Sequence, residues 1–157
     1  MDDDAIVEAQ LGRVPRGRWT VAARCHLGIP MAIENHPRLD DGAPFPTLFW
    51  LTCPVLVKRV SRLEASGFMA DLTHRLERDG ALRARMDVAL DRYRVRRDRH
   101  EVIDDGDAPP GGGPARVKCL HAHLAHQISD GPNPVGAITL ASAGWPDCRT
   151  ACVEPGQ

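Results

Sequence analysis

Thiol and imidazole side chains are the residue types in this chain that could carry chemistry. The sequence holds five cysteines and seven histidines, and the densest group is Val117–His126, which reads VKCLHAHLAH. If this run is helical, Cys119, His123 and His126 share one face, at phases of about 0°, 40° and −20°. A cysteine and a histidine four residues apart suit either one shared metal ion or a nucleophile–base pair.

A second cysteine, Cys53, stands between the apolar run Thr47–Thr52 and Pro54. Proline is favoured at the first position of a helix, so Cys53 is expected where the free backbone N–H groups of a helix point. That position is expected to lower the pKa of the thiol. The context favours a reactive thiolate or an anion-binding turn, with a small buried cysteine as the structural alternative.

A third cysteine, Cys25, ends the first predicted strand. Three cysteines at the ends of separate elements, together with a histidine, form the ligand set of a zinc site or of an iron–sulfur cluster. We therefore predict Cys25, Cys53, Cys119 and His123 as metal ligands, with zinc or an iron–sulfur cluster as the cofactor. The C-x-x-C knuckle that is common in structural zinc modules does not occur in the sequence.

Two other functions stay open. The first is a thiol-dependent enzyme that uses Cys53 or Cys119 as nucleophile and His121 or His123 as base. The second is an interaction module without chemistry, in which the arginine-rich helix Arg83–Arg99 contacts an acidic partner. The sequence lacks a Walker loop, a dinucleotide-binding glycine motif, a G-x-S-x-G motif and an H-E-x-x-H motif.

Hydrophobic periodicity and the spacing of glycine and proline predict an α+β fold, a small sheet of about three strands packed against four to five helices. One domain is expected over residues 1–144, with a flexible connector over 104–115 and a disordered tail over 145–157. That tail holds the remaining pair, Cys148 and Cys152. The expected strands are Trp19–Cys25, Pro30–Ile33 and Thr47–Thr52. The expected helices are Asp2–Gln10, Pro54–Ser66, Phe68–Val102 with a break at Gly80, and Arg116–Asp130, followed by a helix or strand over Pro134–Ala143.

The composition limits the cellular location and the classes of partner that the protein can have. The net charge is −1, which gives no clear nucleic-acid signature. The longest nearly uncharged apolar run, Phe45–Val57, is too short to span a bilayer, and the acidic start Met1–Asp4 does not resemble a secretory signal. Five cysteines in such a chain are typical of reduced thiols. We therefore expect a cytoplasmic protein.

Several long motifs resemble a known family. The motifs read RCHLGIP at 24–30, NHPRLDD at 35–41, PFPTLFWLTCP at 44–54, VKCLHAHLAH at 117–126 and NPVG at 133–136. They resemble the bacterial, mainly actinobacterial, domain-of-unknown-function family 501 over roughly residues 5 to 140. The family has no established activity, so the resemblance implies no reaction.

The family's motif positions fall on cysteines and histidines already considered. Cys148 and Cys152 lie beyond the matching motifs, which makes them weaker ligand candidates. His36 stands where the family pattern has proline, so it is not expected to be functional. The motif positions in this chain are Cys25, Cys53, Cys119, His121 and His123.

Overall fold

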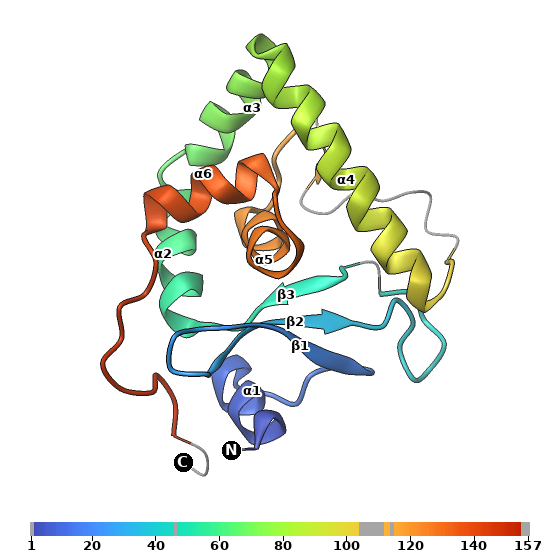
Figure 1. The fold of residues 1–157 in the computed structure, drawn as a ribbon, viewed down its shortest axis with the longest axis vertical. Coiled ribbons are helices and arrows are strands. Elements are labelled where there is room, and N and C mark those ends of the chain that lie inside the picture. The colour runs from blue at the N-terminus through green and yellow to red at the C-terminus, as the bar shows by residue number, and fades with distance from the viewer. Residues whose placement is uncertain (1, 46, 104–111, 114, 155–157) are drawn as a thin grey trace.

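The regular elements of the chain follow the predicted order (Figure 1). A computed structural model describes all residues except 1, 46, 104–111, 114 and 155–157. In chain order the elements are α1 (Asp3–Leu11), β1 (Trp19–Arg24), β2 (Pro30–Asn35), β3 (Phe49–Leu51), α2 (Pro54–Ala65), α3 (Phe68–Arg78), α4 (Gly80–His100), α5 (Leu120–Asp130) and α6 (Pro134–Ala143).

The predicted α+β class is confirmed. The three strands form one antiparallel sheet in the order β1-β2-β3. In the pairing of β2 with β3, Ala32 lies opposite Leu51 and Glu34 lies opposite Phe49. The third strand is shorter than the apolar run Thr47–Thr52 that predicted it.

Helices cover both faces of the sheet. Helix α5 runs across one face, enclosed by α2, α4 and α6, while α1 lies on the opposite face (Figure 1). Because both faces are covered, all six residues of β2 are buried. One of these residues is Glu34. Its carboxylate accepts a hydrogen bond from Arg96 at 2.6 Å and contacts the His100 ring at 2.7 Å. Burial alone would raise the pKa of Glu34, but these two partners outweigh it and the pKa is lowered.

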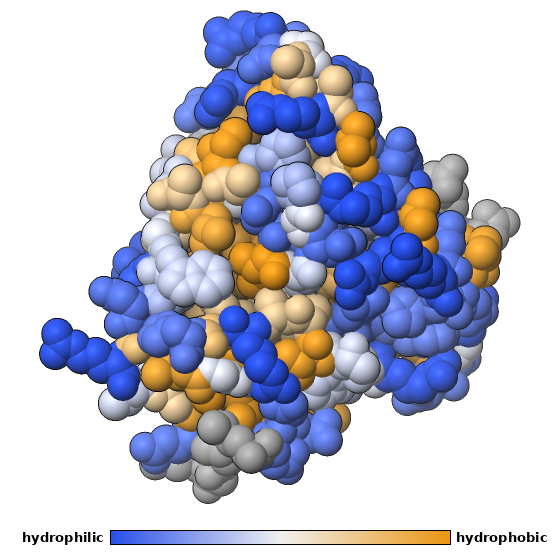
Figure 2. Space-filling view, in the orientation of Figure 1, coloured by the Kyte–Doolittle hydropathy of each residue, from blue (hydrophilic) through white to orange (hydrophobic). Residues whose placement is uncertain are grey.

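Several arginines of helix α4 are more buried than the charged composition of the helix indicates. Arg97 is only 2% exposed, and Arg92 donates to the carbonyl oxygen of Asp130 at 2.9 Å. Arg96 also pairs with the Asp130 carboxylate at 3.3 Å. These arginines tie α4 to the sheet and to the end of α5, so they serve the fold. Figure 2 shows a largely hydrophilic surface along α4. Arg83, Arg85 and Arg99 of this helix are exposed.

Helix α5 begins later than predicted, and the difference decides the geometry of the site. We expected a helix from Arg116, but the helix starts at Leu120 with Cys119 as its N-cap in extended backbone. Just before it, the backbone N–H of Val117 donates to the hydroxyl of Thr73 at 3.1 Å, which holds the approach in a non-helical conformation. The predicted common face of Cys119 and His123 is therefore wrong, because Cys119 precedes the helix.

The segments between and after the helices are partly described. Most of the connector predicted over residues 104–115 lies outside the described residues. Residues 145–154 follow α6 without a helix or strand. Their path returns to the hairpin between β1 and β2, where the ring of His26 contacts the carbonyl oxygen of Cys148 at 2.7 Å. None of the described helices combines the length and the apolar composition needed to cross a membrane.

Candidate functional site

The start of α5 holds a partly buried thiol. Cys119 is the N-cap residue, next to the backbone N–H groups of the first helical turn, although its side chain makes no capping hydrogen bond. The N–H groups of a first turn have no partner inside the helix, and the helix dipole places partial positive charge there. The position therefore favours the thiolate form over the thiol.

His121, in the same turn, offers both ring nitrogens to acceptors. Its Nδ1 lies 3.1 Å from Oε1 of Glu64, and its Nε2 lies 3.3 Å from the carbonyl oxygen of Val57. Nε2 also lies 3.2 Å from the hydroxyl of Ser61, which itself donates to that carbonyl at 2.7 Å. A carboxylate and a carbonyl can only accept, so the doubly protonated ring satisfies both of these contacts. This arrangement suits an imidazolium.

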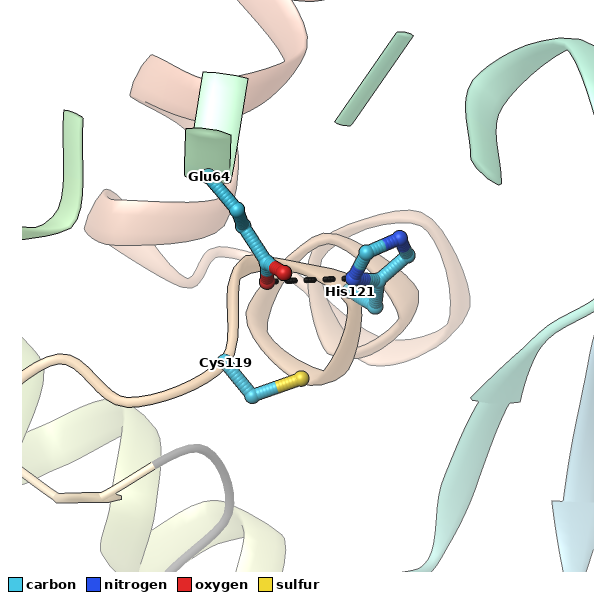
Figure 3. A group of neighbouring side chains, drawn as sticks. All are labelled: Glu64, Cys119 and His121. Carbon is cyan, nitrogen blue, oxygen red and sulfur yellow. Dashed lines mark hydrogen bonds and ion pairs between the residues drawn. The ribbon is translucent and has the colours of Figure 1, made fainter. Parts of the chain in front are cut away.

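Glu64 joins α2 to this turn. Its Oε1 accepts from the backbone N–H of Leu120 at 2.8 Å as well as from His121. Figure 3 shows the carboxylate reaching the imidazole from α2, with the thiol of Cys119 beside the ring. Glu64 therefore caps α5 and orients His121 through the same oxygen.

The charges of the pair follow from these contacts. Burial would raise the pKa of the Cys119 thiol, but the neighbouring His121 ring and the N–H of Ala122 outweigh it and lower the pKa. The neighbouring Cys119 is also the largest cause that raises the pKa of His121, to about 9, with Glu64 adding to it. The ordinary pKa of a histidine is near 6.5. Near neutral pH the pair is therefore drawn toward thiolate and imidazolium.

A largely apolar cavity of about 480 Å³ opens beside the pair. Its volume lies in the range of small-molecule sites. Cys119 and His121 belong to its wall, whereas Glu64 lies behind them, against a different hollow. The rest of the wall comes from the end of α1, from β3 and from the start of α2, and includes Leu11, Phe49, Trp50, Leu51, Pro54 and Val57.

The same three side chains are a geometrically possible metal site. One potential ligand atom from each of Glu64, Cys119 and His121 lies within 4.8 Å of the others. Within the described part of the chain, no other group of three or more such side chains meets that limit. A glutamate, a cysteine and a histidine are all ligands that zinc accepts.

The predicted ligands Cys25, Cys53, Cys119 and His123 lie in three different places. Cys119 belongs to the site above. Cys25 and Cys53 lie together in a narrow pocket under residues 146–152. The expected low pKa of Cys53 is wrong, because burial raises the pKa of this thiol against the opposing effect of the Leu56 and Val55 N–H groups.

His123, the fourth predicted ligand, belongs to a buried polar group behind α5. The amide nitrogen of Asn133 donates to Nδ1 of His123 and to Nδ1 of His126, each at 3.1 Å. The Asn133 oxygen accepts from the N–H of Gly136 at 2.9 Å and so caps α6. Both histidines are 0% exposed. One amide thus joins two helices through two rings, which is a structural role.

His126 makes the fold sensitive to acid. Burial is the largest cause that lowers its pKa, to about 3, with the positive charge of Arg92 adding to it. The unfolded chain therefore binds one more proton than the folded chain between about pH 6.5 and 3. We expect this residue to remove about 1.4 kcal/mol of unfolding free energy for each pH unit lost in that window.

Urea titrations at a series of pH values check this expectation. The variant His126→Phe keeps an aromatic ring against Phe49 and Tyr93, which now pack at 5.7 and 5.3 Å between ring centroids. Its unfolding free energy should depend less steeply on pH than that of the unmodified protein. Equal slopes would show that His126 is not buried in the neutral form.

Sequence reasoning found Cys119 and His121 but missed Glu64. The sequence did contain one indication that Glu64 has a partner elsewhere, namely its position in the last turn of α2. An acidic residue there opposes the helix dipole, and such a placement needs compensation from another part of the molecule. The compensation comes from Leu120 and His121, some 56 residues further along the chain, and no spacing rule connects the two.

The fold and the site define a small α+β protein with a polarised cysteine–histidine pair at a helix start, beside an apolar cavity. The chain belongs to the family described as protein of unknown function (DUF501), whose model matches residues 21–141. The match contains Glu64, Cys119 and His121 and ends before Cys148. No curated protein and no solved structure matches the chain.

Proposed function

We propose that this protein is a thiol-dependent enzyme in which Cys119 is the nucleophile and His121 the proton donor and acceptor. The observation that carries the proposal is the hydrogen bonding of His121. Both ring nitrogens face acceptors, at 3.1 Å from Glu64 and 3.3 Å from Val57, beside a cysteine at a helix start. A thiolate held next to an imidazolium is the activated form of a cysteine nucleophile.

The reaction class that this pair suits is acyl transfer. The thiolate of Cys119 attacks a carbonyl carbon, a C–S bond forms, and the leaving group departs with the proton of the His121 imidazolium. The neutral imidazole then takes a proton from water as the water attacks the thioester. Release of the acid restores the thiolate and the imidazolium. Glu64 positions the ring and stabilises its charge throughout, as the third member of such a group does.

The substrate class follows from the cavity. A wall built from Phe49, Trp50, Leu51, Pro54 and Val57 favours an apolar body, and about 480 Å³ accommodates a small molecule. We therefore propose a small ester or thioester with an apolar acyl group. A free reactive thiolate also suits a reducing compartment, in agreement with the expected cytoplasmic location.

Aryl esters and thioesters of short fatty acids are suitable probes. Incubation with the full-length protein should attach one acyl group to Cys119, detected by the mass of the intact protein and by peptide mapping. The variant Cys119→Ser should lose both the acyl adduct and the release of the leaving group. The variant His74→Asn, an exposed histidine on α3, should keep both.

Two results would contradict the proposal. One is acylation that is unchanged in Cys119→Ser. The other is acylation spread over several cysteines at similar rates, because an ordinary set of thiols reacts in that way.

A zinc site at Glu64, Cys119 and His121 is the second candidate, favoured by their mutual approach within 4.8 Å. Zinc would require His121 to give up a proton and one of its acceptors, since a metal binds a ring nitrogen through its lone pair. The candidate predicts bound zinc that disappears in Cys119→Ser. The thiol-enzyme proposal predicts no change in zinc content for that variant.

A further inference from the structure

The four cysteines outside the candidate active site lie around one pocket. Cys25 follows β1, Cys53 is the N-cap of α2, and Cys148 and Cys152 belong to the segment after α6. All four line the same narrow pocket. Thus three segments that are far apart in the sequence each bring thiols to one place.

The pocket is too small for an organic ligand. Its volume is about 10 Å³, and apart from the cysteines its wall is mainly apolar, with Leu27, Ile29, Pro30, Met31 and Pro146. The ring of His26, which also lines it, already contacts the Cys148 carbonyl oxygen at 2.7 Å. Sulfur is therefore the main donor type that the pocket offers, and an apolar surrounding excludes competing water from a metal centre.

The segment after α6 is mostly exposed, with Pro146 buried, Cys148 half-buried and Cys152 exposed. Residues 147, 149, 150 and 151 are exposed, and residues 145–154 form no helix or strand. Two side-chain contacts of this segment are at its cysteines. His26 contacts the backbone of Cys148, and Gln10 Nε2 lies 4.0 Å from Sγ of Cys152. Within this segment Cys148 and Cys152 line the same pocket as Cys25 and Cys53, so a shared metal would fasten the segment to the end of β1 and the start of α2.

We propose that Cys25, Cys53, Cys148 and Cys152 form a tetrathiolate site for a soft metal, either one zinc ion or an iron–sulfur cluster. Four cysteine ligands serve both centres. The position of Cys53 at the start of α2 adds the favourable field of a helix N-terminus to the negative charge of such a centre. This site is independent of the proposed acyl transfer at Cys119.

The distances between the sulfurs bear on which metal is bound. Four sulfurs about 2.3 Å from one zinc ion lie about 3.8 Å apart. Among the described residues no three of these cysteines come within 4.8 Å of one another. Binding one zinc ion would therefore draw the segment 145–154 inward. In a 4Fe–4S cluster each thiolate binds a different iron atom, so the sulfurs stay further apart.

The test compares metal content in matched variants of the full chain without a histidine tag. One preparation is made aerobically with added zinc, and the other anaerobically with added ferrous iron and sulfide. We expect about one zinc ion per chain in the first, or iron and sulfide in equal amounts with visible absorbance in the second. The double variant Cys148→Ser/Cys152→Ser should bind at least about tenfold less of the same metal.

The variant Cys119→Ser is the matched control and should keep the full metal content. Circular dichroism checks that the double variant is folded, which is expected because both serines replace cysteines in a segment without regular structure. Three results on metal content would overturn the proposal. These are absence of metal in both preparations, metal retained by the folded double variant, and metal lost only in Cys119→Ser. A disulfide between Cys148 and Cys152 in metal-free, folded protein would also overturn it.

Discussion

Replacing His121 by asparagine is expected to slow the alkylation of Cys119 by iodoacetamide about 10-fold at neutral pH. The neighbouring His121 is the largest of the causes that lower the pKa of Cys119, and asparagine carries no positive charge. Without the imidazolium the pKa of Cys119 rises, and the thiolate fraction at neutral pH falls. The remaining thiolate is intrinsically more nucleophilic, which offsets part of the loss.

Peptide mapping after short exposures to iodoacetamide measures this rate for each cysteine separately. In the unmodified protein Cys119 should react faster than the buried Cys53, whose pKa is raised by burial. The control is His74→Asn, which removes an exposed histidine that contacts Glu77 on the same helix and leaves Cys119 unaffected. An equal rate in His121→Asn and His74→Asn would remove the basis for an activated thiol.

Gly136→Ala is expected to lower the free energy of unfolding by about 3 kcal/mol or more. Gly136 lies in the first turn of α6, where that helix crosses α5. An added Cβ would overlap the backbone carbonyl of His123 and would lie 2.7 Å from Cβ of Gln127. A backbone carbonyl inside a helix cannot move aside as a side chain can, so the two helices must separate. This separation would also break the hydrogen bonds by which Asn133 caps α6 and contacts both buried histidines.

Urea unfolding followed by circular dichroism measures this loss. The control is Gly80→Ala at the start of α4, where an added Cβ meets nothing within 4 Å. Alanine favours the helix there, so the control should be unchanged or more stable by up to about 1 kcal/mol. Similar stabilities of the two variants would show that α5 and α6 are not in close contact at Gly136.

Much of the fold was predictable because local chemistry determines it. Asp2 and Gly12 bound α1, Pro54 begins α2, and the glycine and aspartate around position 80 separate α3 from α4. These are capping effects within a few residues of the chain. The order of the strands was not readable, since it depends on how α5 packs across the sheet.

The site was predictable only in part, because its assembly depends on one helix boundary. Placing the start of α5 at Arg116 puts Cys119 on the face of His123, whereas the true start at Leu120 puts it beside His121. The boundary is set by contacts with Thr73 and Glu64, which lie on other helices. Such contacts between distant segments leave no periodic pattern in the sequence. The sequence likewise did not predict that Cys148 lies near Cys25 and Cys53, because these residues belong to distant segments.

The most direct test of the account is the pH titration of the Cys119 thiolate. The ultraviolet absorbance of thiolate is followed in the unmodified protein and in Cys119→Ser, and the difference isolates Cys119. The account predicts a midpoint clearly below 9.0, the ordinary value from which the pKa is lowered, and a shift to higher pH in His121→Asn. A midpoint at or above the ordinary thiol value, unchanged in His121→Asn, would contradict the thiolate–imidazolium pair.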